Sequence, residues 1–546
     1  MPRRGDDREI GHCKLHDHCG LCGFTFYPID HVAALILVSS ETNGNTIYKA
    51  LDASLIPVGL GHLFGGTYFC RGFCQHCLRL PETATVHVDC YNLYLRLATL
   101  PERLARLYRV ATSKLPWREY AARPLETPRN VQSIISKAAG FLCFDSLEHL
   151  PYEIKAEICK YLGTGVLERL DVVQRIIHDM PAGTGEWLSV PVAHVQYWQR
   201  GATPVVQMRN AMISPRRLVI DSQGIRIIES SEAPSRSSRP GTELFVVASP
   251  ADSKCEFRYG ICRLVGFGAK PCVWKEKPRV WNMPNPPRLE DCNSNFSSDR
   301  IPDYLGAIDL SVCFGITFFN EYNRTIRIHA HTRSQPTAEQ TFRQMGQIVR
   351  YSMSWIYVPL SPADTPTAYE VTSYCDVDGR TRYGLVNHCF RTSLAGDFTV
   401  GPWYEHNKAT VYNISRRSTL IHDLVDPRDC YRPYQLSRIY PQSAECADFS
   451  PAAPHSPPPI KKACFSSARL GSIRRAWIYR CEERHVCKGL IIDYMSGGTA
   501  GSRELRRWCG SHRVLRRFSP HLLFSRHCIS WQANLPMCRN QGQSQD

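Results

Sequence analysis

The sequence predicts an α+β chain of several domains: a small Cys/His-rich head, a few short helices, and a mostly antiparallel β body of the sandwich or prism type. Three observations support this. Close Cys and His pairs fall within residues 11–100, and an apolar stripe at helical spacing follows near residue 150. From about residue 190, short β-branched and aromatic segments alternate with turn residues. With 546 residues, the chain is long enough for several domains that each bury a core.

The head contains three ligand pairs, each with two residues between its members. They are Cys19 with Cys22, Cys74 with Cys77, and His87 with Cys90. Two such pairs from distant parts of a chain supply the four ligands of a tetrahedral structural zinc, because each pair spans one edge of the tetrahedron. Cys13 and His16 form a further pair that can complete a second site. We therefore expect structural zinc here, with the sharing of ligands open. The alternative is a set of buried thiols that pack as small apolar residues.

The C-G-L-C-G turn at residues 19–23, combined with His87 and Cys90 at the start of a predicted helix, resembles the treble-clef zinc folds. The pattern C-x-x-C with H-x-x-C is also similar to PHD- and RING-type fingers. The resemblance covers the ligand pattern and not a whole domain. Because the candidate ligands close their own sites and leave no position for water, we expect a metal ion that holds the fold together and takes no part in catalysis.

A helix with one apolar face is predicted within residues 144–162, FDSLEHLPYEIKAEICKYL. Leu150, Ile154, Ile158 and Leu162 recur every fourth residue, with Leu147 just ahead of them. Pro151 fits the first helical turn, where its missing N–H would have no intrahelical partner.

This segment resembles an F-box, whose opening pattern is followed by Leu147, Leu150, Pro151, Ile154, Ile158 and Leu162. The resemblance implies that these residues dock on a Skp-type adaptor. The chain would then be a non-catalytic substrate receptor of a cullin-RING ubiquitin ligase, with the β body as its recognition part. The alternative is an amphipathic helix packed into its own protein.

The expected domain order follows from these features and from the punctuation of the chain. Prolines at 116, 124 and 128 interrupt a helix-prone stretch, and SPAAPHSPPP at 450–459 reads as a polyproline-type linker. The expected parts are a zinc module at 1–100, a helical and proline connector at 101–140, an F-box-like segment at 141–180, a β-rich domain at 190–430, a linker at 450–465, a small β module at 466–510 and a basic, disordered tail at 511–546.

The β-rich domain carries one further candidate site. His329 and His331 alternate along a predicted strand and so point to the same face. We expect a solvated strand face here rather than a metal site, because no third ligand stands at a defined spacing.

Two wider resemblances complete this picture. The strands and glycine turn within 472–498 are similar in order to jacalin-like β-prism lectins. The V-H-V-D-C of the head, I-D-S-Q-G-I-R-I-I at 220–228, I-H-A-H-T-R at 328–333 and L-A-G-D-F-T-V-G-P at 394–402 look like a large set of uncharacterised proteins from filamentous fungi. That set implies a domain order but no activity.

The net charge of +16 is concentrated in the last part of the chain. Residues 461–546 hold 16 Lys and Arg against 5 Asp and Glu, so the preceding residues are nearly neutral. A basic tail supplies non-specific attraction to nucleic acid. Binding of nucleic acid through this tail is thus one alternative function, and a lectin-like or protein-binding β module with a zinc head is another.

No catalytic motif of the G-x-S-x-G, H-E-x-x-H, Walker A or G-x-G-x-x-G type occurs, so we expect a binding protein and not an enzyme. The N-terminal residues contain no apolar run typical of a signal peptide. We therefore expect the cytoplasm or nucleus, where the 24 cysteines serve as free thiols or metal ligands.

Overall fold

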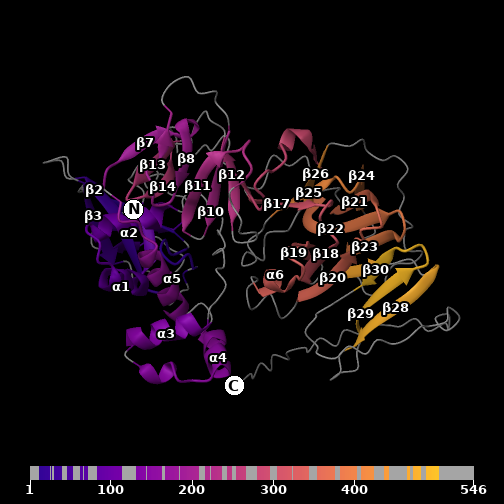
Figure 1. Ribbon diagram of the computed structural model, residues 1–546, viewed down its shortest axis with the longest axis horizontal. Helices are drawn as coiled ribbons and strands as arrows, with labels where there is room; N and C mark the ends of the chain where they lie inside the picture. The colour runs from indigo at the N-terminus through magenta and orange to yellow at the C-terminus, as the bar shows by residue number, and fades with distance from the viewer. Residues whose placement is uncertain are drawn as a thin grey trace, which may run out of the picture. The chain divides into compact units, whose positions relative to one another are not determined.

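The computed structural model describes residues 11–16, 18–24, 26, 30–39, 46–52, 62–64, 67–71, 83–113, 131–142, 144–162, 166–183, 185–207, 215–221, 223–235, 243–248, 254–265, 279–294, 304–321, 324–343, 353–375, 381–402, 407–423, 436–441, 464–467, 471–480 and 487–502. The chain divides into two units (Figure 1). Unit 1 comprises Met1–Glu290, Phe296–Ala307 and Ile421–Asp426, and unit 2 comprises Asp291–Asn295, Ile308–Leu420 and Pro427–Asp546. The boundary thus falls inside the expected β-rich domain at 190–430.

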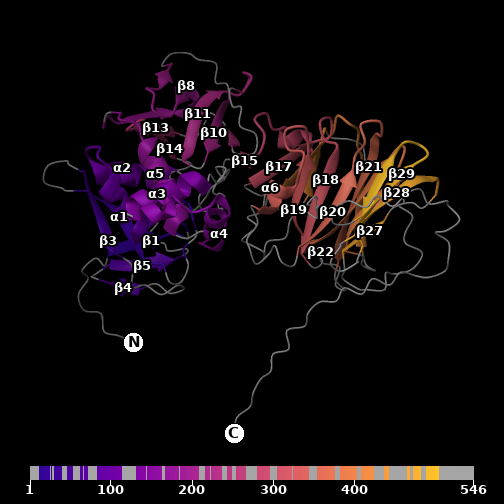
Figure 2. The same ribbon diagram turned by 60° about the horizontal axis from the view of Figure 1, so that its bottom comes forward.

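The N-terminal part of unit 1 contains two small sheets (Figure 2). In the first, β1 (Gly11–Leu15) pairs in parallel with β5 (Thr67–Arg71), which pairs antiparallel with β4 (His62–Phe64). In the second, β2 (Val32–Ser39) lies between β3 (Thr46–Asp52) and β6 (Ala84–His87), antiparallel to both. Helix α1 (Val88–Leu97) begins at the residue after β6. Segments distant in sequence therefore meet at the junction of β6 and α1.

Four helical segments follow the head. They are α2 (Arg103–Ser113), α3 (Val131–Leu142), α4 (Tyr152–Leu162) and α5 (Val166–His178), and a single 3-10 turn, η3 (Asp145–Leu147), precedes α4. The core of this region combines apolar residues of the head strands with those of α1, α2 and α5. Helix α3 contacts both α4 and α5.

Helix α2 is buried from Ala105 to its end, although it falls in the basic stretch expected to be a connector. The terminal nitrogens of its two buried arginines have oxygen partners. The guanidinium of Arg106 donates to the carbonyls of Pro181 and Gly183, both at 2.9 Å. Arg109 forms an ion pair of 3.1 Å with Glu256. Long cationic side chains can be buried when carbonyl or carboxylate oxygens accept their hydrogen bonds. The basic composition of this stretch therefore does not mean that its helix is exposed to solvent.

Two β-sheets complete unit 1. The smaller has the order β14-β13-β7, formed by β7 (Leu188–Pro191), β13 (Lys254–Arg258) and β14 (Ile261–Val265). The larger includes the run β25-β17-β15-β12-β10-β11-β8-β9, in which β25 spans Thr419–Asp423. Its strands are β8 (Val195–Gln199), β9 (Val205–Val206), β10 (Arg216–Asp221), β11 (Gly224–Ser230), β12 (Leu244–Ala248), β15 (Val280–Trp281) and β17 (Tyr304–Asp309). The stretch at 220–228 spans the turn between β10 and β11, where Gly224 has a φ of 103°.

Unit 2 is built from antiparallel strands in two facing layers (Figure 2). One layer has the order β19-β18-β20, from β18 (Gly315–Glu321), β19 (Arg324–His331) and β20 (Met353–Pro359). The other has the order β24-β21-β22-β23-β27, from β21 (Pro366–Cys375), β22 (Thr381–Thr392), β23 (Gly396–Pro402), β24 (Asn407–Asn413) and β27 (Cys464–Ser467). Phe318 of the first layer packs against His388 and Phe390 of the second, with ring centroids 5.1 and 6.2 Å apart.

Smaller elements of unit 2 flank these layers. A short helix, α6 (Glu339–Arg343), follows β19, and β16 (Asn293–Ser294) pairs with β26 (Leu436–Tyr440). A three-stranded meander forms from β28 (Ile473–Arg480), β29 (Cys487–Tyr494) and β30 (Thr499–Ser502) within the range expected for a small β module. Ser496, in the turn between β29 and β30, donates to the carbonyl of Leu394 at 2.7 Å.

The prediction of a mostly β chain with few helices and several antiparallel sheets is confirmed. Of the expected linker at 450–465, only residues 464 and 465 are described, and they lie in β27. The expected tail at 511–546 lies outside the described residues, as do Cys74 and Cys77. Within the part of the chain that is described, no helix combines the length and apolar character needed to cross a membrane.

Candidate functional site

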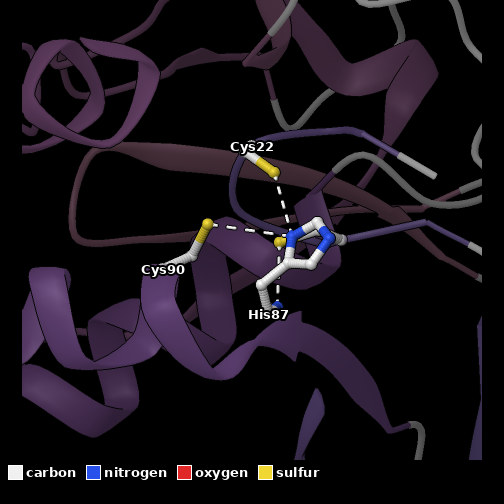
Figure 3. A group of neighbouring side chains, drawn as sticks. Cys22, His87 and Cys90 are labelled. Carbon is white, nitrogen blue, oxygen red and sulfur yellow. Dashed lines mark hydrogen bonds between the residues drawn. The ribbon is translucent and has the colours of Figure 1, made fainter. Parts of the chain in front are cut away.

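Four predicted ligands of the head converge in unit 1. The ligand atoms of Cys19, Cys22, His87 and Cys90 all lie within 4.8 Å of one another, and all four residues are buried (Figure 3). Such a group can hold a metal ion. The sequence left open which pairs share a site, and the structure brings together the first pair and the last.

Local backbone geometry places each ligand. The turn at Cys19–Gly23 is closed by a hydrogen bond of 2.8 Å from the Gly23 N–H to the Cys19 carbonyl, and Gly23 has a φ of 80°, which suits glycine. The Gly20 N–H donates to the carbonyl of Thr85 at 2.7 Å and so fixes this turn on β6. His87 is the last residue of β6, and Cys90 lies in the first turn of α1.

The ring of His87 turns its Nδ1 atom toward the thiols (Figure 3). Nδ1 lies 3.3 Å from Cys22 Sγ and 3.8 Å from Cys90 Sγ, and the backbone N–H of His87 donates to Cys19 Sγ at 3.3 Å. Nδ1 is therefore the nitrogen that a shared metal ion would contact, and Nε2 points away from the thiols.

Three thiols in one buried site cannot all ionise easily without a cation. Burial and the charge of Cys19 raise the pKa of Cys22 well above its ordinary value. Hydrogen bonds with Cys19 and Cys22, together with burial, raise the pKa of Cys90. Burial also acts to raise the pKa of Cys19, but hydrogen bonds from Cys22, Cys90 and His87 outweigh it and lower that pKa. A bound divalent cation would compensate the charge of all three thiolates.

The other upstream candidates do not join this group. Cys13 is buried in β1, and burial raises its pKa to about 12, which is typical of a structural thiol. The Nε2 atom of His16 lies 2.9 Å from the carbonyl of Thr83. Cys74 and Cys77, the ligands with which Cys13 and His16 could complete a second site, lie outside the described residues, so the second site stays a prediction.

Two residues that the sequence did not indicate lie on the side of the His87 ring opposite the thiols. Asp30 Oδ2 lies 3.4 Å from His87 Nε2, and Asp30 Oδ1 accepts a hydrogen bond of 2.9 Å from Arg169 of α5. Neither residue stands at a spacing that belongs to a ligand motif, so only the fold could reveal them.

The six predicted docking residues lie in η3, in α4 and between them. Ile154 is 48% exposed and Pro151 is also exposed, while Leu147, Leu150 and Ile158 are half-buried. The side chain of Leu162 is outside the described residues. Two neighbours that the pattern did not single out, Phe144 and Tyr152, are 56% and 62% exposed.

Helix α4 turns a different face toward its own protein. Lys155, next to Ile154, is buried, and its ammonium donates to the Glu148 carbonyl at 2.8 Å and to Gln132 of α3 at 3.0 Å. Since Lys155 lies about 100° around the helix from Ile154, the outward position of Ile154 follows from this inward contact.

The two alternating histidines of β19 are buried, and the expectation of a solvated strand face was wrong. His329 is hydrogen-bonded to Thr341 at 2.8 Å, and His331 to Thr317 at 2.7 Å. Their remaining nitrogens face the carbonyls of Gln335 and Pro336. All four ring nitrogens are engaged by protein groups, which leaves none for a metal ion.

No protein-family description, curated protein or solved structure matches this chain.

Proposed function

We propose that this protein is a non-catalytic, F-box-like substrate receptor of a cullin-RING ubiquitin ligase. Helix α4 and the residues before it dock on a Skp-type adaptor, a structural zinc ion organises the head, and the β body recognises the target. The observation that carries this proposal is the outward position of Phe144, Tyr152 and Ile154. We call these three residues the apolar docking cluster.

The docking cluster concentrates exposed apolar surface in a short stretch. Among the described residues, seven large apolar side chains are exposed, and three of them fall within residues 144–154. Single exposed apolar residues are common, but three within one short segment are a concentration that favours binding of another protein there. The coincidence of this surface with the F-box-like pattern Leu147-x-x-Leu150-Pro151 supports a Skp-type adaptor as its partner.

Zinc is the metal that best fits the ligand group. In a tetrahedral site with Zn–S near 2.3 Å and Zn–N near 2.0 Å, sulfur and nitrogen ligands are roughly 3.5 Å apart. The distances from His87 Nδ1 to the two cysteine sulfurs, 3.3 and 3.8 Å, lie on either side of this value. Three thiolates and one imidazole also form a complete four-ligand set, which is typical of structural zinc.

The docking proposal is tested by binding of the purified full-length chain to a purified Skp-type adaptor, comparing wild type with Ile154→Asp. Completing the burial of a half-exposed isoleucine contributes about 1 kcal/mol, and a carboxylate placed in the same apolar contact costs several kcal/mol more. We therefore expect at least a hundredfold loss of affinity, with the fold retained because position 154 is open to solvent.

Val312→Asp is the matched control, because Val312 is 58% exposed and lies in unit 2. It introduces the same charge at a similar exposure, and we expect adaptor binding at wild-type strength. Equal binding by wild type and Ile154→Asp would refute the docking proposal.

A further inference from the structure

The orientation of His87 assigns a distinct role to each of its ring nitrogens. Because Nδ1 faces the sulfurs of Cys22 and Cys90, a metal ion on Nδ1 leaves the ring proton on Nε2. Nε2 lies 3.4 Å from Asp30 Oδ2, within ion-pair distance but without hydrogen-bond geometry. A small rotation of the ring toward a metal ion can convert this approach into a hydrogen bond.

Asp30 is itself held in place by α5. Arg169 donates to Asp30 Oδ1 at 2.9 Å and lies 3.6 Å from Asp89 Oδ2. Asp30 and Arg169 are both largely buried, whereas Asp89 is exposed. Burying two charges costs desolvation free energy, which the attraction between Asp30 and Arg169 offsets only while both are present. Removing either residue therefore leaves the other as an unpaired, largely buried charge.

The same helix belongs to the core around the ligands. Leu170, Val173 and Ile176 of α5 share one apolar cluster with Cys22 and Cys90. Helix α5 also contacts both α3 and α4, and α4 carries Ile154. A continuous set of contacts therefore leads from His87 through Asp30 and Arg169 to the helices beside the docking cluster.

We propose that Asp30 is a positioning residue for the metal centre and that the Asp30–Arg169 pair couples metal binding to the seating of α5. This inference rests on the proposed metal site. Asp30 accepts the Nε2 proton of His87, which orients the ring and makes Nδ1 a better donor to the metal. Arg169 of α5 is bonded to the same carboxylate, so the position of Asp30 beside His87 also fixes the position of α5. Loss of metal would therefore loosen α5 and the helices that it contacts.

The test compares full-length wild type, Asp30→Asn, Arg169→Gln and Asp89→Asn. Zinc affinity is measured by competition with a chelator, the ligand set by the absorption spectrum of Co²⁺ in place of zinc, and the order of α5 by hydrogen exchange. Removing an outer-shell carboxylate typically lowers metal affinity roughly 10- to 100-fold. We expect a loss of this size in Asp30→Asn, with the three-thiolate Co²⁺ spectrum retained and faster exchange in α5. Arg169→Gln should also speed exchange in α5.

Asp89→Asn is the matched control because Asp89 also lies near Arg169 and beside a ligand in the sequence, but its carboxylate is exposed, whereas Asp30 is the carboxylate that lies near His87 Nε2. We expect it to retain wild-type affinity. Wild-type affinity in Asp30→Asn, or an equal loss in Asp89→Asn, would overturn the inference and leave the metal site standing. A wild-type chain that takes up neither zinc nor Co²⁺ would overturn the metal site and the inference together.

Discussion

Acid should destabilise unit 2 through three buried histidines. Burial lowers the pKa of His329 from 6.5 to about 3, with the neighbouring His331 contributing, and burial alone lowers the pKa of His388 to about 3. Burial also lowers the pKa of His331. The unfolded chain binds a proton on each imidazole near pH 6.5, whereas in the folded chain His329 and His388 stay neutral down to about pH 3 and His331 protonates only below its ordinary pKa. Stability is therefore full above pH 6.5 and is lost as the pH falls through this window.

The size of the effect follows from the pKa differences. Each pKa unit corresponds to about 1.4 kcal/mol, so at pH 5 His329 and His388 each remove about 2 kcal/mol of folding free energy. Their sum, about 4 kcal/mol, is a large part of the stability of an ordinary domain.

Hydrogen exchange of peptides from β19 and β22 at pH 7 and pH 5, corrected for the intrinsic exchange rate, measures this loss. His329→Gln keeps a polar side chain beside Thr341 but cannot titrate, so its loss of stability between pH 7 and pH 5 should be about 2 kcal/mol smaller than that of wild type. Unchanged protection of β19 and β22 at pH 5, or a full pH dependence in His329→Gln, would show that these imidazoles do not control acid stability.

Three further predictions concern single side chains. The guanidinium of Arg416 donates to the carbonyls of Leu310, Cys313, Leu360, Ser361 and Asp364. Arg416→Met should therefore lower the free energy of unfolding of unit 2, measured in urea, by about 3 kcal/mol or more. A urea unfolding midpoint equal to that of wild type would contradict this. A Cβ on Gly498 would lie 2.5 Å from the backbone nitrogen of Ala395, so Gly498→Ala should speed hydrogen exchange in β29 and β30. Gly396→Ala is the control, because a Cβ there meets no atom within 4 Å. Its φ of 83° should cost only about 1 kcal/mol of stability. Cys90→Ser should lower the metal content found by elemental mass spectrometry, while Cys13→Ser, buried outside the ligand group, should keep it; equal metal content in the two variants would refute the assignment.

The ligand pairs and the β-rich body could be predicted because each has a local signature. A gap of two residues between ligands suits one edge of a tetrahedron, whatever the rest of the fold. Alternation of β-branched and aromatic residues between turns likewise predicts strands such as β18 and β19. Which ligand pairs combine depends on how β6 lies beside the Cys19–Gly23 turn, and that contact is not local.

Burial of polar residues was the main feature that local patterns did not predict. Arg106 and His331 have polar side chains that suggest solvent, yet each is buried because a carbonyl or hydroxyl group from another element bonds to it. Lys155 is buried in the same way against the Glu148 carbonyl and Gln132 of α3. Asp30 was missed for the same reason. Its role depends on His87 and Arg169, which lie 57 and 139 residues further along the chain.

A metal ion on the four ligands would also close a ring in the chain. One ion would join Cys22 to His87, and the strand pairings of β1 with β5 and of β2 with β6 likewise join early residues of the head to later ones. After a single protease cut between these two ligands, the metal ion and the strand pairings would therefore both hold the fragments together. Co-elution of the nicked fragments in gel filtration, followed by their separation after chelation in mild denaturant, would reveal this ring. During synthesis the four-ligand set is complete only after Cys90 has left the ribosome, so the full metal site forms only once the whole head has been made.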